Sequence, residues 1–282
     1  MKETLLTKDA VSNPNLIVNG DFQVWQKGEV FSEAYNQYTA DNWAIVNINS
    51  SDTTKVKVSH LELSSNFPQG NITNAMYIQN AKEGRTALRY IFNETCKGKN
   101  MLSFYVIGTG SKIQVAINSF SNIINIKTTN DWTRAEIPCE DVNYIWFILG
   151  EGETYITGVK LEAGIIATKF NSKSYVDTFI ECVPHFYRHN SGVAPCSFYG
   201  NIAYVHIPLP APMIKTPTVS FSDGVGFLSD GLIWTEFTNI SVDSTGKNGI
   251  LLKCECKNTL NESGIAGRLG GLGYIDLDCQ IY

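Results

Sequence analysis

Apolar and polar residues alternate in short segments along the first 170 residues of the chain, and this period of two is that of half-buried β-strands. Turns such as Gly108-Thr109-Gly110 separate the segments at spacings typical of a β-sandwich. No helical period of useful length occurs among them. The pattern predicts strands at residues 43–48, 55–63, 75–79, 86–92, 100–107, 112–117, 134–137, 144–149 and 155–161.

Residues 15–28 are expected to form the opening strand of this sandwich. Asn19-Gly20 is a common turn dipeptide, but it is interpreted here as a bulge because apolar residues continue on both sides of it. The apolar residues that share one parity in this segment are Leu16, Val18, Phe22 and Val24.

Residues 158–170 are expected to close the same sandwich and to lead out of it. The alternation places Val159 and Leu161 on the core side, beside the opening strand. Phe170 should then anchor the exit segment as an apolar contact. A domain boundary is therefore expected at residues 170–175.

The next segment carries a helical signal. Ser174 can cap the N-terminus of a helix, and Pro184 would end it. The apolar positions of this helix follow the spacing i, i+4, i+7 and i+8 and are Tyr175, Phe179, Cys182 and Val183.

A second run of strands follows the helix. The Gly-rich run 264–273 lacks the P-loop motif and its strand–turn–helix context, so it is interpreted as a flexible surface loop and not as a phosphate site. An exposed or edge crossing is marked by Pro208, Pro210, Pro212 and Pro217. Strands are predicted at residues 186–189, 194–209, 218–221, 232–242, 249–257 and 273–282.

These elements predict an all-β fold with an N-terminal jelly-roll β-sandwich, a short connecting helix and a second, C-terminal β-sandwich. Residues 1–14 are polar and aperiodic, which fits either a frayed end or an attachment arm that orders on a partner. The domains are then residues 1–14 as the arm, 15–172 as the jelly roll, 173–185 as the connector and 186–282 as the C-terminal tip domain.

Composition supports folded domains and excludes several classes of protein. A chain of 282 residues with 43% hydrophobic and 17% charged residues can form two cores. The net charge of −5 argues against a nucleic-acid binder. The apolar run 144–149 is far too short to span a membrane, and the first ten residues lack the apolar stretch of a secretory signal. Seven cysteines without framework spacing predict reduced, apolar fillers.

No catalytic motif is found, so we expect a protein that is not an enzyme. The four histidines lack metal-ligand spacing, and there is no nucleophile elbow. Aromatic rings can cover the apolar face of a sugar, so aromatic residues in predicted loops are the ligand-binding candidates, each with a structural role as the alternative. These candidates are Tyr35, Tyr38, Tyr199, Tyr204 and Trp234.

Several motifs in order resemble those of bacteriophage tail fibre and receptor-binding proteins, which carry a jelly roll similar to carbohydrate-binding modules. The motifs are Asn15 to Gly28, Tyr38 to Trp43, and Gly158 to Gly164 followed by Ala167, Thr168 and Phe170. The resemblance continues at residues 175–187, 212–219 and 274–282. The family tends to have a Cys followed by a basic-aromatic pair, and this chain departs from it with Cys182-Val183-Pro184-His185-Phe186-Tyr187.

The resemblance implies a non-enzymatic virion protein, assembled in the cytoplasm of a bacterial host as a homotrimer. Its partners would be other virion proteins, contacted through residues 1–14, and a glycan or protein of the host surface. No nucleic acid and no membrane insertion are expected. The alternatives are a capsid decoration or head fibre protein without a receptor role, and a tail-associated glycan hydrolase, which would need two facing carboxylates.

No cofactor is expected, with one alternative. Jelly rolls of this kind often hold a structural calcium ion between the opening and closing strands, and the resemblance would place its oxygen ligands at Asn19, Asp21 and Glu162. Otherwise, Asp21 accepts hydrogen bonds from turn amides and Glu162 is a solvated charge at a strand end.

Overall fold

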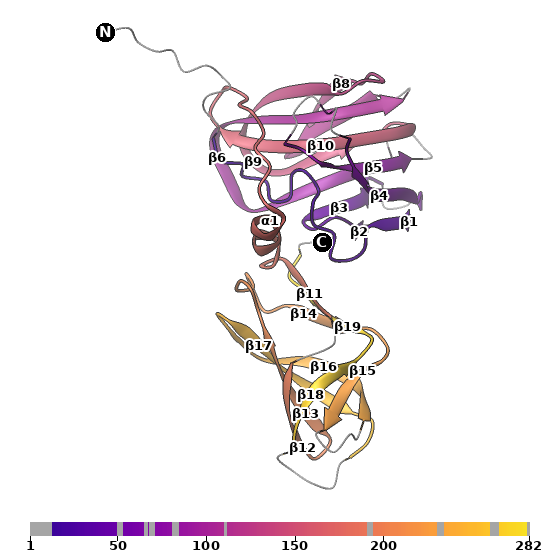
Figure 1. Cartoon of the computed structure of the whole chain (residues 1–282). Coiled ribbons are helices and arrows are strands. Elements are labelled where there is room, and N and C mark those ends of the chain that lie inside the picture. The colour runs from indigo at the N-terminus through magenta and orange to yellow at the C-terminus, as the bar shows by residue number, and fades with distance from the viewer. Residues whose placement is uncertain are drawn as a thin grey trace, which may run out of the picture. The chain divides into compact units, whose positions relative to one another are not determined.

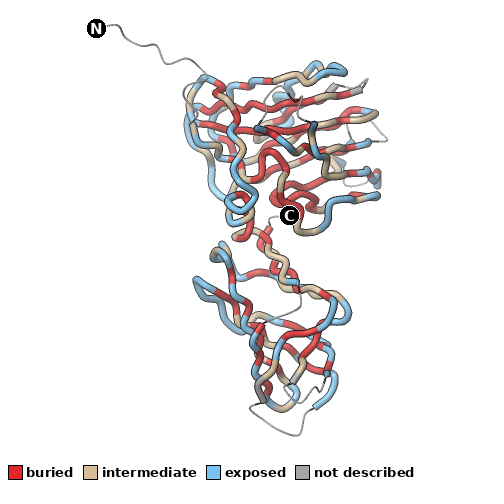
Figure 2. Tube along the Cα trace, viewed as in Figure 1, coloured by how far each residue is buried: buried red, intermediate tan, exposed pale blue. Residues whose placement is uncertain are grey.

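The computed structural model is built almost entirely of β-strands (Figure 1). It describes residues 13–49, 53–64, 67, 71–80, 85–109, 112–190, 194–229, 234–259 and 265–280. Residues 1–12 of the predicted arm lie outside this part of the chain. Two compact units are present, the first ending at Thr178 and the second beginning at Phe179, and each has its own buried core (Figure 2). Within the described residues, no helix has the length and apolarity needed to cross a membrane.

Among the described residues, the first unit contains ten strands. They are β1 (Val30–Ala34), β2 (Gln37–Tyr38), β3 (Trp43–Asn47), β4 (Val56–Glu62), β5 (Asn74–Asn80), β6 (Thr86–Thr109), β7 (Lys112–Ile117), β8 (Ser119–Lys127), β9 (Thr133–Ile148) and β10 (Gly152–Ala163). Most were predicted, but each of the two longest joins two predicted strands into one. The pattern missed β1, β2 and β8.

The long strands β6 and β9 pair with each other along both of their halves. The first half of β6 also pairs with β3, and its second half pairs with β10. The register of the β6–β9 pair breaks between Ile91 and Cys96 and again between Cys96 and Lys99. We call the layer of β1, β4, β5 and β10 with the adjoining halves of β6 and β9 sheet I. Sheet II contains β2, β3, β7 and β8 with the other two halves.

The two sheets enclose one apolar core, as expected for the predicted jelly-roll sandwich. Phe104 from the sheet I half of β6 meets Phe147 from the sheet II half of β9 edge to face, with ring centroids 5.0 Å apart. Trp43 lies against Phe147 at 6.1 Å and is fully buried. Val159 and Leu161 also face this core, which confirms their predicted orientation.

The predicted opening strand does not form, because residues 15–28 adopt turns and irregular backbone instead of a β-strand. Asn19 and Phe22 have left-handed backbones, with φ of 56° and 54°. The Asn15 side chain instead bonds the backbone of β10, donating to the Val159 carbonyl at 3.0 Å and accepting from the Leu161 amide at 3.0 Å. A register shift in β10 between Thr157 and Lys160 leaves backbone groups that this segment satisfies.

A buried ion pair holds the exit segment against β10. Lys160 and Glu162 are 1% and 0% exposed, with Nζ and Oε2 3.3 Å apart. The Thr168 hydroxyl accepts a hydrogen bond from Lys160 Nζ at 2.7 Å and donates one to Glu162 Oε2 at 2.5 Å. Glu162 is therefore not the solvated strand-end charge considered above. Phe170 is buried against Phe67 and other apolar residues, so it anchors this segment as predicted.

The predicted helix is present as α1 (Tyr175–Cys182). Ser174 Oγ accepts a hydrogen bond from the Asp177 amide at 3.1 Å and donates one to Asp177 Oδ2 at 2.7 Å, so Ser174 is the expected N-cap. The acidic Asp177 in the first turn also suits the positive end of the helix dipole.

The second unit is all-β, but its main sheet closes into a barrel where two open sheets were expected. Strands β12 (Pro195–Tyr199), β13 (Ile202–Pro208), β17 (Gly249–Cys256), β16 (Trp234–Gly246), β15 (Val225–Ser229) and β18 (Ile265–Gly271) form the barrel in this order. Strands β11 (Phe186–Asn190), β19 (Tyr274–Asp278) and β14 (Thr218–Phe221) form a separate three-stranded sheet. The pairing of β12 with β18 closes this sheet and leaves it without unpaired edges. All seven cysteines are free thiols, as predicted.

The Gly-rich run 264–273 was predicted to be a surface loop and is instead mostly the barrel strand β18. A Cβ atom on Gly267 would lie 2.5 Å from the Leu228 carbonyl oxygen and 2.6 Å from the Phe227 ring. Glycine is required there by close packing against β15 and not by a turn. Composition alone suggested chain flexibility, whereas the neighbouring strand explains the glycine.

We predict that Lys160→Met destabilises the first unit by about 3–5 kcal/mol, because it leaves the Glu162 carboxylate buried without its cation. The double variant Lys160→Met/Glu162→Gln should recover part of this loss. Urea denaturation followed by tryptophan fluorescence measures both. Lys57→Met on β4, at an exposed position, is the matched control and should change stability by less than about 0.5 kcal/mol. A loss below about 1 kcal/mol for Lys160→Met would contradict a structural role for the pair.

Candidate functional site

The five aromatic residues predicted from sequence are dispersed over both units. Tyr38 is only 6% exposed, in β2, and the Lys27 ammonium lies 5.5 Å from its ring centroid. Tyr35 and Tyr204 are half-buried. Tyr199 and Trp234 belong to the barrel and are 69% and 38% exposed. Burial therefore leaves Tyr199 and Trp234 as the most accessible rings of the five.

The three predicted calcium ligands bond different protein partners. The Asn19 amide donates to the backbone carbonyls of Val24 and Asp41. Asp21 accepts from Ser172 Oγ and from Gln23 Nε2, and burial raises the pKa of its carboxyl. Glu162 is engaged in the ion pair described above. In the part of the chain that the structure describes, no cluster of three or more His, Cys, Asp or Glu residues could hold a metal.

The outer face of sheet II carries aromatic, cationic and amide side chains. Antiparallel pairing puts one residue from each strand in a row across the sheet, from β2 to β8. These residues are Tyr38, Ala44, Arg89, Trp146, Ala116 and Ile123. A neighbouring row contains Val46, Ala87, Ile148, Gln114 and Asn125. Arg89, Gln114 and Trp146 are half-buried, and Trp146 packs against a small buried apolar cluster on this face. The cluster consists of Tyr38, Ala44, Val46, Ala87, Ala116 and Ile148.

Two nitrogen donors at the centre of this face are not hydrogen-bonded. The Arg89 guanidinium lies 5.5 Å from the Trp146 ring centroid. Arg89 Nε and Trp146 Nε1 are both shielded from solvent and have no hydrogen-bond partner among the described residues. Such donors carry a free-energy cost unless a ligand or water accepts from them.

Aromatic and amide groups surround these donors. The exposed Phe120 ring packs edge to face on Trp146, with centroids 5.0 Å apart. Tyr144 also packs against Trp146, with ring centroids 6.3 Å apart. Across the strand pair, Gln114 Nε2 donates to Asn125 Oδ1 at 2.9 Å. We call Arg89, Gln114, Phe120, Tyr144 and Trp146 the sheet II cluster.

Sequence reasoning missed this cluster because Trp146 lies in the apolar run 144–149, which predicted a buried strand. The alternation of side chains along β9 could have shown that Trp146 faces outward. Ile145 and Phe147 face the core, so Trp146 must point to the opposite side of β9. The partners Arg89 and Gln114 could not be assigned without the register of β6 and β7.

The outer face of sheet I carries a smaller polar cluster. Tyr77 of β5 and Tyr155 of β10 pack with ring centroids 5.0 Å apart, and both hydroxyls donate to Glu153, at 2.9 and 3.2 Å. Burial, together with the adjacent Glu153, raises the pKa of Tyr77 to about 12. The two hydroxyls and the carboxylate already satisfy one another, so this face has less unused hydrogen-bonding capacity than the sheet II cluster.

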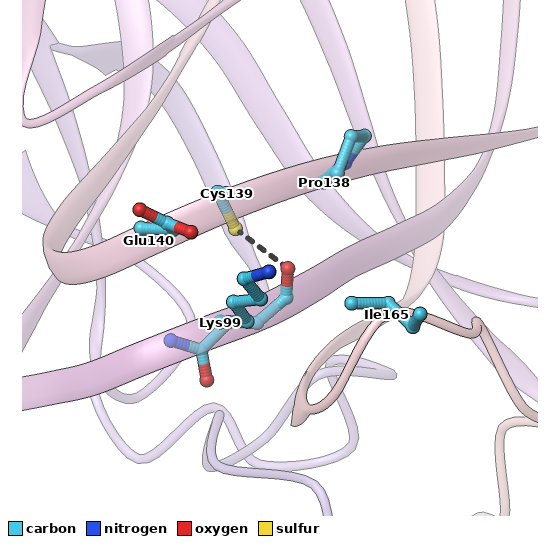
Figure 3. A pocket seen from close by; sticks show the side chains of 6 residues that line it. Lys99, Pro138, Cys139, Glu140 and Ile165 are labelled. Atoms are coloured by element: carbon cyan, nitrogen blue, oxygen red, sulfur yellow. Dashed lines mark hydrogen bonds between the residues drawn. The ribbon is translucent and has the colours of Figure 1, made fainter.

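A pocket of about 380 Å³ lies where β6 and β9 change from one sheet to the other (Figure 3). It is lined by Lys99, Asn100, Pro138, Cys139, Glu140 and Ile165. The Cys139 thiol is directed toward the Asn100 carbonyl oxygen, 3.6 Å away. Burial raises the pKa of this thiol to about 11, which disfavours the nucleophilic thiolate. With one carboxylate and no aromatic ring among its lining residues, the pocket suits neither glycoside hydrolysis nor sugar stacking.

No family model matches the chain, and no curated protein sequence is significantly similar to it. Among solved structures, the enzymatically active domain of bacteriophage CBA120 tailspike protein 4 is 13% identical over 52% of this chain and 21% of that chain, with a TM-score of 0.37. The module TmCBM61, solved with β-1,4-galactotriose, is 20% identical over 52% of this chain and 97% of that one, with a TM-score of 0.35. A family 11 carbohydrate-binding module of Clostridium thermocellum is 13% identical over 49% and 97%, with a TM-score of 0.31. These similarities concern the fold alone.

We predict that Cys139 reacts slowly with iodoacetamide in the folded protein. At pH 8, a thiol with a pKa of about 11 is ionised in only about one molecule in a thousand, and its rate of alkylation should rise about tenfold per pH unit up to that pKa. Peptide mass spectrometry at several pH values measures the rate. The same residue in urea-unfolded protein is the control and should react far faster at pH 8. Equal rates in the two states would contradict the assigned burial.

Proposed function

We propose that this protein is a structural virion protein of a bacteriophage, of the fibre or receptor-binding type, and that it binds glycans of the host surface through the sheet II cluster. The observation that carries the glycan-binding part is the pair of buried, unmatched donors on Arg89 and Trp146, set among aromatic rings. Residues 1–14 would attach the protein to other virion proteins. The protein is proposed to bind its glycan without cleaving it and to act as a homotrimer.

The chemistry of the sheet II cluster suits a sugar. Pyranose rings combine apolar C–H faces, which pack on aromatic rings, with hydroxyls that accept and donate hydrogen bonds. Trp146, Tyr144 and Phe120 supply the rings. A hydroxyl oxygen can accept from Arg89 Nε and from the indole N–H of Trp146 once the side chains that shield these two donors move aside.

The virion part of the proposal is supported by the sequence. Motifs from Asn15 to Tyr282 resemble those of phage tail fibre and receptor-binding proteins in the same order along the chain. The structure gives a physical reason for two of them. Asn15 satisfies the backbone of β10, and Lys160, Glu162 and Thr168 form the buried network that holds the exit segment.

We predict that the full chain binds at least one polysaccharide on a microarray of capsular, lipopolysaccharide and wall glycans from bacteria. Arg89→Ala and Trp146→Ala should each weaken this binding about tenfold or more, which corresponds to about 1.4 kcal/mol. Gln79→Ala, at an exposed position of β5 in sheet I, is the matched control and should bind like the wild type. Unchanged binding by Arg89→Ala, with an unchanged melting temperature, would refute the assignment to this face.

Three further measurements test the remaining parts of this proposal. Light scattering should give the mass of a trimer, and a monomer would contradict that part. Mass spectrometry of purified particles should detect the protein, and deletion of residues 1–14 should abolish its incorporation.

Release of reducing ends from the bound polysaccharide would overturn the proposal that the protein binds its glycan without cleaving it.

A further inference from the structure

The barrel carries an exposed tryptophan that rests on a surface of glycines. Trp234, at the start of β16, is 38% exposed. Cβ atoms placed on Gly226 of β15 and Gly270 of β18 would each lie 2.9 Å from atoms of its ring, and one on Gly271 would lie 3.1 Å away. The benzene ring of the indole therefore lies over the backbone of β15 and β18, and the side chain remains partly exposed.

This arrangement fixes the orientation of the ring. A larger residue at Gly270 would push the indole outward, because the Trp234 ring is the group nearest to its Cβ. A Cβ on Gly226 would first meet the Thr235 carbonyl oxygen, at 2.2 Å, so backbone packing also requires glycine there. Glycine in a strand interior ordinarily weakens the strand, since it has no side chain to pack. Placing glycines under one exposed ring on two neighbouring strands thus costs stability and yields a preoriented aromatic surface.

Charged side chains flank the ring on the same outer face of the barrel. Arg268 pairs with Leu228, which pairs with Trp234, so the three residues form one row across β18, β15 and β16. Glu236 lies two residues along β16 and faces the same side, with its carboxylate 3.9 Å from Lys257 Nζ. Both Arg268 and Glu236 are exposed. The exposed part of the indole therefore has a hydrogen-bond donor and an acceptor nearby.

We propose that Trp234, Arg268 and Glu236 form a second, independent sugar-binding site on the barrel. The exposed part of the Trp234 ring takes the apolar face of a pyranose, while Arg268 donates to ring hydroxyls and Glu236 accepts from them. Pyranoses whose hydroxyls are all equatorial present the flattest C–H face to an indole. The preferred ligands are therefore β-1,4-linked oligomers of glucose or N-acetylglucosamine, and an axial hydroxyl disfavours binding.

The test uses the full chain with cellotriose and chitotriose as probes, measured by isothermal titration calorimetry and saturation-transfer NMR. Trp234→Ala should weaken binding at least tenfold. Arg268→Ala changes an exposed side chain, so it should preserve the fold while weakening binding about threefold or more. Tyr199→Ala is the matched control, because Tyr199 is an exposed barrel aromatic on β12, outside the row that contains Trp234, and it should leave binding unchanged.

The same titrations in an Arg89→Ala background separate this site from the sheet II cluster. Binding of a probe that survives Arg89→Ala and is lost on adding Trp234→Ala supports the barrel site, whatever the outcome for the sheet II cluster. Binding that is abolished by Arg89→Ala alone supports only the sheet II cluster and overturns the barrel site. Failure of both probes to bind the wild type, or wild-type affinity in a folded Trp234→Ala variant, also overturns it.

Discussion

The antiparallel pairing of β6 with β9 is the constraint on which the first unit depends. Each strand contributes one half to each sheet, so the two sheets are joined by two continuous strands. The same pairing puts Arg89 opposite Trp146 at one end and creates the pocket beside Cys139 where the strands change sheets. A shift of this pair's register by one residue would turn the core-facing side chains outward. The same shift would separate the residues of the sheet II cluster.

Sequence patterns predicted the strands that have one buried and one exposed face, because such strands alternate apolar and polar residues with a period of two. They also placed the helix, whose N-cap Ser174 is a local signal. What they missed depends on distant neighbours. Residues 15–28 looked like a strand, yet the backbone groups they satisfy belong to β10, and the glycines of β18 looked flexible because Phe227 and Trp234 are remote in sequence. The role of Trp146 was hidden for the same reason, since its partners come from β6 and β7.

The two units hold a tryptophan on an outer face of a sheet in different ways. In the sandwich, Trp146 is supported by neighbouring large side chains, Arg89 and Phe120. In the barrel, Trp234 is supported by the absence of side chains beneath it. A ring held among other side chains can shift as they change rotamer, whereas a ring on backbone has one resting position. The first arrangement suits an adaptable contact and the second a fixed one.

The bonds of Asn15 also bear on how the chain is made. Its side chain bonds Val159 and Leu161, which follow it by 144 and 146 residues. A ribosome adding about 5–20 residues per second needs about 7–30 s to supply these partners. During that interval β10, the central strand of sheet I, does not exist, so β5 and β6 lack the strand that lies between them. The sandwich therefore closes only after its last strand emerges, and the edges of β5 and β6 that pair with β10 stay unpaired until then.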